Sequence, residues 1–320
     1  MKIQCKLVFS ERLTMSMGNY DEISGSSTEE LIDRADKIRQ RCMGERLEVC
    51  SIINARSGSC PEDCKYCAQS ARYCTDVKEY PLVHDDDILG AARLAGHNGA
   101  ERFGIVTSGN RLTREDIKRI AATIREMTLV SKIKPCASLG ALEEEDLRML
   151  KEAGLTRYHH NIETSARFYP NVVTTHDHSQ RVNTIKAAKR SGLEVCSGGI
   201  LGMGETWQDR VDMALLLKEL EVDSVPLNFL VPINGTPMAG REVMSPEDAL
   251  RAIAIFRIIL EDVEIKIVAG REAVFKDMQE MIFKAGANGM MIGGYLTIAG
   301  RTVEEDTALL GQVRRSWRLR

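Results

Sequence analysis

The sequence has no long apolar run, no basic stretch interleaved with aromatic residues and no low-complexity tract. No run reaches the roughly 18 apolar residues of a membrane span, and no charged head precedes a long apolar stretch at the N-terminus. The 43 basic and 46 acidic residues leave a net charge of −3, so nothing favours a nucleic-acid partner. We therefore expect a cytoplasmic protein that binds neither membranes nor nucleic acid.

The chain also lacks a linker rich in proline and glycine, which favours a single domain. Its 320 residues, 43% of them hydrophobic, can bury a large core. Residues 1–26 show little pattern, and we expect a mobile tail without an assigned role. Ser27 and Glu30 then form a capping-box pattern that predicts a helix up to about Cys42. Residues 27–320 are expected to fold as one domain.

Short apolar runs alternate with longer amphipathic segments along that domain. Eight evenly spaced strands with intervening helices favour a (β/α)8 barrel of the TIM type, and an open doubly wound sheet is the alternative. The expected strands are 47–53, 102–107, 133–138, 157–162, 194–201, 224–230, 264–269 and 289–293. The expected helices between them are 114–127, 142–153, 181–191, 208–220, 246–260 and 271–285.

Three of the nine cysteines, Cys60, Cys64 and Cys67, follow the first strand, where the loops of a barrel carry chemistry. Clustered cysteines in a reducing compartment favour metal ligation over disulfides. A 4Fe-4S cluster normally takes four thiolates, so three leave one iron open and make the cluster a reaction site. A structural zinc site would need a second ligand pair at a characteristic spacing, which does not follow.

Four histidines invite a different metal interpretation. Their spacings match no common ligand set, so loop or surface placement is expected instead. They are His84, His97, His176 and His178.

The three-thiol loop, with Tyr66 before its last cysteine, resembles the signature of radical S-adenosylmethionine enzymes. The resemblance implies a 4Fe-4S cluster whose open iron binds S-adenosylmethionine, from which an electron releases a 5′-deoxyadenosyl radical. The protein then positions and shields a radical made by the cofactor.

Within that superfamily the chain resembles the biotin synthases over nearly its whole length after the tail. This resemblance implies sulfur insertion into dethiobiotin, two S-adenosylmethionine molecules, an electron donor such as flavodoxin or ferredoxin, and a homodimer. Another radical enzyme on the same barrel, such as a mutase or a hydrogenase-maturase-like protein, is one alternative, and a zinc or redox thiol protein is another. The stretches that carry the resemblance are 50–58, 60–70, 158–164, 195–205, 224–228, 235–237 and 269–272.

The resemblance further implies an auxiliary 2Fe-2S cluster deep in the barrel, the source of the sulfur. Its usual ligands are cysteines on the second, third and fifth strands and an arginine on the seventh. Cys136, Cys196 and Arg271 match the last three positions, whereas Gly104 stands at the second-strand position.

Cys50 is the expected replacement, because one barrel layer receives its side chains from alternate strands. Cys50, Cys136, Cys196 and Arg271 would then share a layer. A buried thiol without a ligand role is the alternative for Cys50, and Cys74, nearer the barrel mouth, is a rival ligand. The glycines at 104 and 289 are expected to leave room for a larger, four-iron cluster on three thiolates.

The remaining site residues follow from the resemblance and suit the chemistry of the two small molecules. Glu163 is expected on ribose hydroxyls and Arg181 on the methionyl carboxylate, while Asn228, Asn161 and His159 are expected on the ureido ring of dethiobiotin. The expected cofactor-binding residues are Tyr66, His159, Asn161, Glu163, Arg181 and Ile200. The expected catalytic residues are Arg271, Asn161 and Asn228.

Overall fold

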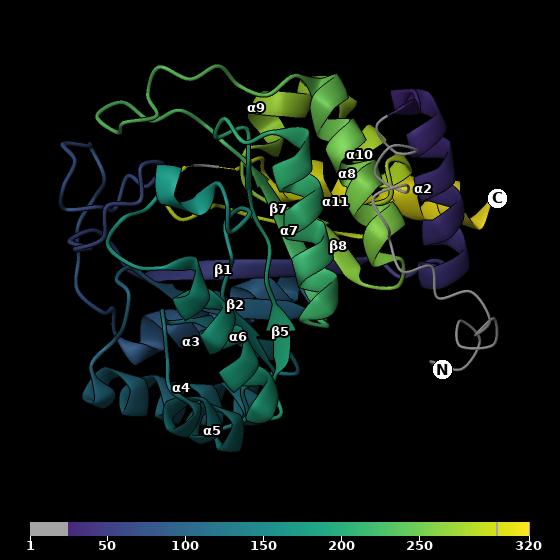
Figure 1. Cartoon of the computed structure of the whole chain (residues 1–320). Coiled ribbons are helices and arrows are strands. Elements are labelled where there is room, and N and C mark those ends of the chain that lie inside the picture. Colours follow the sequence, from purple (N-terminus) through teal and green to yellow (C-terminus); the bar gives the residue numbers. More distant parts are fainter. Residues whose placement is uncertain (1–24, 299, 320) are drawn as a thin grey trace.

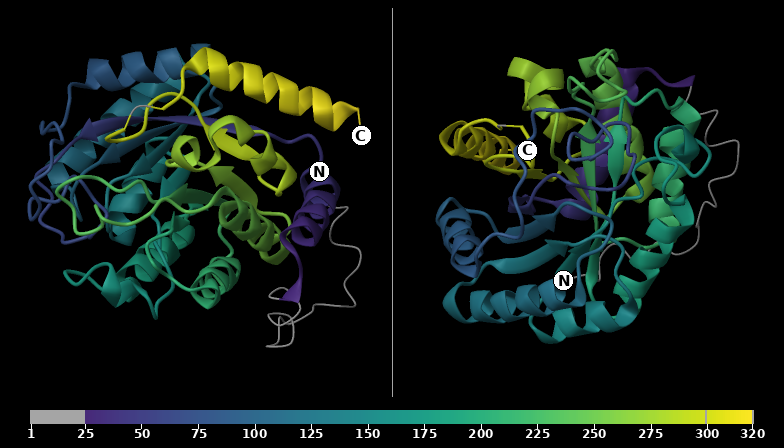
Figure 2. Two further views of the ribbon diagram at one scale, coloured as in Figure 1. Left: turned by 90° about the horizontal axis from the view of Figure 1, so that it is seen from above. Right: turned by 90° about the vertical axis from the view of Figure 1, so that its left-hand side faces the viewer.

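The computed structural model describes residues 25–298 and 300–319, and these form a ring of parallel strands surrounded by helices (Figures 1 and 2). Neighbouring strands follow the order β5-β4-β3-β2-β1-β9-β8-β7-β6, and a pairing between β5 and β7 closes the ring. Because β5 and β6 together occupy the fifth position, the barrel has eight strand positions. The predicted (β/α)8 barrel is therefore confirmed over the open sheet.

All eight predicted strands are present, and the fifth is divided after Cys196. A Cβ atom at Gly198 would lie 1.9 Å from the carbonyl oxygen of Pro226, so only glycine allows the close approach at this division. The strands are β1 Glu48–Arg56, β2 Arg102–Thr107, β3 Lys134–Ser138, β4 Arg157–His159, β5 Glu194–Cys196, β6 Gly199–Leu201, β7 Ser224–Phe229, β8 Glu264–Ile267 and β9 Gly289–Met291.

The first described helix begins as the sequence predicts, because Ser27 and Glu30 form the reciprocal bonds of a capping box. The predicted tail lies outside the described residues except for positions 25 and 26. The helices are α2 Thr28–Met43, α3 Asp85–His97, α4 Arg114–Val130, α5 Glu144–Glu152, α6 His178–Arg190, α7 Trp207–Glu219, α8 Pro246–Leu260, α9 Arg271–Phe275, α10 Met281–Lys284 and α11 Val303–Arg318, with short 3-10 turns at Tyr169–Asn171 and Lys276–Met278.

The single helix expected over 271–285 is wrong, since two short helices and a 3-10 turn replace it. Lys276 ends α9 with a φ of 45°, a left-handed backbone conformation that stops helical hydrogen bonding. Helices α3 and α11 were not anticipated. Within the described residues, no helix combines the length and the apolar character needed to cross a bilayer.

Alternation along the strands separates an apolar outer face from a polar interior. Residues such as Phe103, Ile105 and Val225 face the helices and belong to the main hydrophobic core. The intervening residues face the inside of the barrel. Side chains fill the interior of such a barrel in layers.

A layer of buried charge fills the N-terminal end of the interior. We name Glu48, Arg102, Arg157 and Glu264, each the first residue of its strand, the charged floor. Arg102 contacts Glu48 at 2.9 Å, and Arg157 contacts Glu48 at 2.8 Å and Glu264 at 3.0 Å. Buried charges require such mutual pairing, so these side chains close that end of the barrel as one network.

Candidate active site

The long segments after β1, β4 and β7 gather at the opposite, C-terminal end of the strands, at the left of Figure 1. The segment after β1 contains the cluster loop, residues 59–70. It folds back on itself, because the backbone nitrogen of Cys60 donates to the carbonyl of Gln69 and Ala71 donates to the carbonyl of Cys60. The three thiols of this loop interact electrostatically with one another.

Cys64 is buried, and Cys60 and Cys67 are partly buried. Burial raises the pKa of Cys67 to about 11, and it raises the pKa of Cys64 as well. Thiolates in such surroundings require a cationic partner. An iron centre held by the three sulfurs would supply one, so the donor set fits the group that the sequence predicts.

The segment after β4 clamps the cluster loop. Asp63 accepts hydrogen bonds from the backbone nitrogens of Thr174 and Thr175 at 2.9 and 3.1 Å, and from both of their hydroxyls. Burial alone would raise the pKa of Asp63, but these bonds lower it to about 2. The backbone nitrogen of Lys65 also donates to the carbonyl of Val172 at 3.0 Å.

Arg181, on α6, extends into the space beside the cluster loop. Its Nε donates to the Tyr169 hydroxyl at 2.7 Å and its Nη1 to the carbonyl of Asn161 at 3.0 Å. Glu163 lies 3.5 Å from Nη1 and has a φ of 67°, which is uncommon for a residue with a side chain. Its backbone pairs with Gly199, where an added Cβ would lie 2.1 Å from the Glu163 carbonyl oxygen.

The two expected amides brace the backbone of the divided fifth strand. Oδ1 of Asn161 accepts from the backbone nitrogen of Gly198 at 3.1 Å, and Nδ2 of Asn228 donates to the carbonyl of Gly199 at the same distance. Tyr66 and Ile200 both pack against one apolar cluster that includes Cys64 and Tyr169. The structure thus brings the expected cofactor residues to one end of the barrel.

Three further thiols lie deeper inside. We name Cys50, Cys136 and Cys196, on the first, third and fifth strand positions, the thiol layer. Each interacts electrostatically with Lys266, on the seventh strand position. Alternate strands therefore supply one layer, as the sequence predicts for the three cysteines.

The thiols of this layer differ in their electrostatic surroundings. Burial raises the pKa of Cys50 to about 11. Burial alone would do the same to Cys196, but the adjacent His159, with Lys266 and Arg157, lowers its pKa to about 7. Lys266 itself contacts the carboxylate of Glu48, so it joins the thiol layer to the charged floor.

The expectation that Arg271 belongs to this layer is wrong. Arg271 begins α9 after Gly270, whose φ of 86° turns the chain away at the end of the seventh strand position. Its guanidinium makes two 2.7 Å bonds to Asp306 and donates to Gln279 and Tyr295 at 2.9 and 3.1 Å. Lys266 is the cation that faces the thiols.

The expectation of extra room beside the two glycines is also wrong. A Cβ at Gly104 would lie 3.1 Å from Cγ2 of Ile52, so that side chain already fills the space. A Cβ at Gly289 would lie 2.8 Å from both the Glu48 carbonyl oxygen and Cγ of Lys266. Gly289 is therefore the residue that lets the lysine side chain pass.

His176 lies in the loop before α6, as loop or surface placement predicts, but its side chain is only 4% exposed. Sequence reasoning also missed Lys266 and the charged floor. Here a signal existed, because six of the described strands begin with a charged residue, and apolar residues alternate after it. No comparable pattern marked His176. Cys74 is exposed in the loop after β1, apart from the thiol layer.

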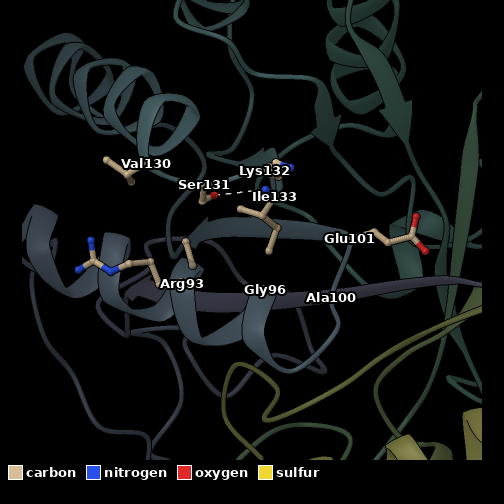
Figure 3. Close-up of a pocket in the computed structure, with 9 residues that line it drawn as sticks. Arg93, Gly96, Ala100, Glu101, Val130, Ser131, Lys132 and Ile133 are labelled. Carbon is tan, nitrogen blue, oxygen red and sulfur yellow. Dashed lines mark hydrogen bonds between the residues drawn. The ribbon is translucent and has the colours of Figure 1, made fainter.

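A pocket of about 360 Å³ opens between α3 and the end of α4 (Figure 3). Arg93, Glu101, Lys132 and Ile133 are among its lining residues. Glu101 and Ile133 immediately precede β2 and β3, so the pocket lies at the N-terminal end of the strands. It is separate from the site formed by the cluster loop.

Comparison with protein-family models gives two matches. Residues 55–217 match the Radical SAM superfamily, and residues 226–313 match the Biotin and Thiamin Synthesis associated domain. Together with the barrel and its three-thiol loop, the first match defines a radical S-adenosylmethionine enzyme.

Curated relatives give the family. A biotin synthase of Thermotoga petrophila is 51% identical over 92% of this chain and 97% of its own, and one of Geobacter sulfurreducens is 47% identical over 91% and 89%. The chain belongs to the biotin synthase family.

Solved structures at lower identity share the fold. Methylornithine synthase superposes with a TM-score of 0.78 at 18% identity, over 93% of this chain and 96% of its own. The FeFe-hydrogenase maturase HydG from Carboxydothermus hydrogenoformans gives 0.77 at 15%, over 91% and 72%. These likenesses concern the barrel alone.

Proposed function

We propose that this enzyme inserts sulfur into dethiobiotin to form biotin, as a sulfurtransferase that consumes S-adenosylmethionine. The observation that carries the proposal is the presence of two separate thiol sets in one barrel. The cluster loop lies at the C-terminal end of the strands, where barrel enzymes perform their chemistry. The thiol layer lies below it, beside the buried cation Lys266.

The first set provides the three ligands of a 4Fe-4S cluster. When bound, that cluster and S-adenosylmethionine supply the radical, and the protein holds and shields it. Arg181 suits the methionyl carboxylate, because the second N–H of its Nη2 makes no hydrogen bond within the described part of the chain. Glu163 suits the ribose hydroxyls, and Tyr66 and Ile200 offer apolar surface to the adenine.

The second set would hold an auxiliary cluster through Cys50, Cys136 and Cys196. Lys266 is charged and forms an ion pair with Glu48. An ammonium group has no lone pair with which to bind iron. A two-iron cluster would then lack its fourth ligand, whereas a four-iron cluster on three thiolates keeps one iron open. We therefore favour a four-iron auxiliary cluster. Iron and sulfide counts with Mössbauer spectra test it, and a purely 2Fe-2S signal beside the radical cluster would contradict it.

Dethiobiotin would bind above the thiol layer. Asn161 and Asn228 each retain hydrogen-bonding capacity beyond their backbone contacts, and His159 lies beside Cys196. Their placement at or just after the end of β4 and on β7 supports contacts to the ureido ring. A reductant such as flavodoxin or ferredoxin and a homodimeric assembly complete the proposal, and sedimentation velocity tests the latter.

Product analysis under anaerobic conditions tests the function. The reduced protein, given S-adenosylmethionine and dethiobiotin, is expected to form biotin and 5′-deoxyadenosine. Cys64→Ala should abolish both products, whereas Cys136→Ala should retain some 5′-deoxyadenosine and lose biotin. Wild-type enzyme that forms 5′-deoxyadenosine without biotin would contradict the proposal.

A further inference from the structure

His176 joins the cluster loop to Arg181 through both of its ring nitrogens. Its Nδ1 lies 2.8 Å from Oε2 of Glu62, and its Nε2 lies 3.0 Å from Nη2 of Arg181. Glu62 stands between Cys60 and Cys64 in the cluster loop. One buried imidazole therefore connects the loop that carries the thiols to a guanidinium on α6.

The hydrogen-bond donors fix the form of this histidine. A guanidinium can only donate, so Nε2 of His176 must accept and Nδ1 must carry the proton that Glu62 accepts. The imidazole is thus neutral in this arrangement. Burial and the neighbouring Arg181 lower the pKa of His176, which agrees with the neutral form.

This contact does more than hold two loops together. Asp63 already ties the cluster loop to Thr174 and Thr175 through four hydrogen bonds. What Glu62 and His176 add is a restraint on the orientation of the Arg181 guanidinium. Tyr169 and the Asn161 carbonyl restrain its Nε and Nη1, and His176 is the partner that restrains Nη2.

We propose that His176 is a positioning residue that orients Arg181 relative to the cluster loop through Glu62. The inference rests on the proposed function, in which Arg181 binds the carboxylate of S-adenosylmethionine. The chain Glu62–His176–Arg181 fixes that carboxylate site relative to the three thiols. Without the imidazole, the guanidinium gains rotational freedom and binds the carboxylate less tightly.

The chain offers a matched pair of variants. His176→Phe keeps a ring edge-on to Tyr169, where the present ring centroids are 6.1 Å apart, and removes both nitrogens. His178 also lies edge-on to Tyr169, at 5.1 Å, and within the described residues its ring bonds only the carbonyl of Thr164. His178→Phe is therefore the control for loss of a nearby histidine.

The dissociation constant of S-adenosylmethionine, measured by anaerobic equilibrium dialysis on the iron-loaded enzyme, tests the proposal. His176→Phe should raise it about tenfold, as expected when the charge-assisted contact of a freely rotating guanidinium is weakened. Iron content and kcat at saturating S-adenosylmethionine should change by less than about twofold. His178→Phe should leave the constant unchanged, and His176→Gln, whose amide oxygen can still accept from Arg181, should recover part of the affinity.

A double-mutant cycle tests whether Glu62 acts on Arg181 through His176 or whether the two residues act independently. Glu62→Gln should weaken binding about threefold in the wild type and add nothing in the His176→Phe background. An unchanged dissociation constant in His176→Phe, equal effects of both phenylalanine variants, or loss of iron from His176→Phe would each overturn the inference.

Arg181→Lys distinguishes this inference from the proposed function. If the wild type binds S-adenosylmethionine and Arg181→Lys weakens it while His176→Phe does not, only the inference fails. If Arg181→Lys leaves binding unchanged, the assignment of the carboxylate site fails and the inference fails with it.

Discussion

Lys266 lies between Glu48 of the charged floor and the thiol layer, so its single positive charge interacts with both. Its pKa is raised, because the surrounding thiols and Glu48 outweigh the effect of burial. The ammonium therefore persists inside the barrel. Under the proposed function, it would compensate the negative charge of a cluster bound by the thiol layer.

We expect Lys266→Met to destabilise the protein by about 3 kcal/mol, because it removes one partner of a buried carboxylate. Lys266→Arg, which keeps the charge, should cost less. Urea unfolding measures the difference, and iron counts on the same variants report loading of the auxiliary site. Equal stability and iron content in Lys266→Met and the wild type would contradict this role.

Cys50 is the member of the thiol layer that no family ligand position predicts, and substitution tests its role directly. Cys50→Ala should remove the auxiliary-cluster signal from Mössbauer spectra and end biotin formation, while retaining some cleavage of S-adenosylmethionine. Cys74→Ala, a change at the exposed rival, should alter neither. Full biotin formation by Cys50→Ala would leave that thiol with a packing role alone.

At the scale of single residues, the sequence predicted the thiols but not the buried cation Lys266. Spacing identified the cluster loop, and the alternation of strands in a layer placed Cys50 with Cys136 and Cys196. The error at Arg271 arose because it stands only two residues after the expected strand. The turn at Gly270 directs the Arg271 side chain to Asp306, and it depends on tertiary contacts that the sequence does not display.

Helix α7 illustrates how single elements are fixed around the site. Asp209 completes its capping box with Thr206 and also accepts from Ser165 at 2.6 Å and contacts Arg167 at 2.7 Å. The start of α7 is thereby attached to the segment after β4. Burial alone would raise the pKa of Asp209, but these partners lower it below its ordinary 3.8.

A carboxyl with a lowered pKa in the folded state stabilises that state above its ordinary pKa, and the contribution is lost as the pH falls through the folded value. We expect Asp209→Asn to cost about 1–2 kcal/mol at pH 7. The difference from wild type should narrow below about pH 4. Urea unfolding across this range measures it.

Asp212→Asn is the control on the same helix, because Asp212 accepts only from the side chain of Gln208 among the hydrogen bonds described. It should cost less than about 0.5 kcal/mol. A pH-independent difference for Asp209→Asn would contradict the electrostatic account.

Elements with strong local signals were predicted best. Pro246 and Ser245 mark the start of α8, and its predicted bounds match the structure. Most strands are within two residues of their predicted ends. The break after Phe275 was not predictable, because neither Lys276 nor its neighbours are residues that usually adopt a positive φ.

At the scale of the whole molecule, helix α11 packs on the barrel and meets α2, the first described helix. The Arg39 guanidinium lies 3.9 Å from the ring centroid of Trp317, and Phe283 packs edge-on against the same ring. The Arg271–Asp306 pair fixes the other end of α11. That residues 27–320 unfold as one domain stays a prediction.

Asp306→Asn should destabilise the enzyme by about 3 kcal/mol, because it leaves the buried Arg271 charge without its bidentate partner. Glu304→Gln, an exposed change in the same turn of α11, should cost less than about 0.5 kcal/mol. Thermal unfolding followed by circular dichroism compares them. Stability of Asp306→Asn equal to that of Glu304→Gln would show that the pair does not anchor the helix.

The charged floor also limits the route by which molecules can reach the thiol layer. Its side chains are almost wholly buried and pair with one another, so material reaching the thiol layer must come past the cluster loop. Dethiobiotin would occupy the same route. Under the proposed function, replacement of a spent sulfur and binding of the next substrate would therefore exclude one another, and a repair system would act on the vacant enzyme between turnovers.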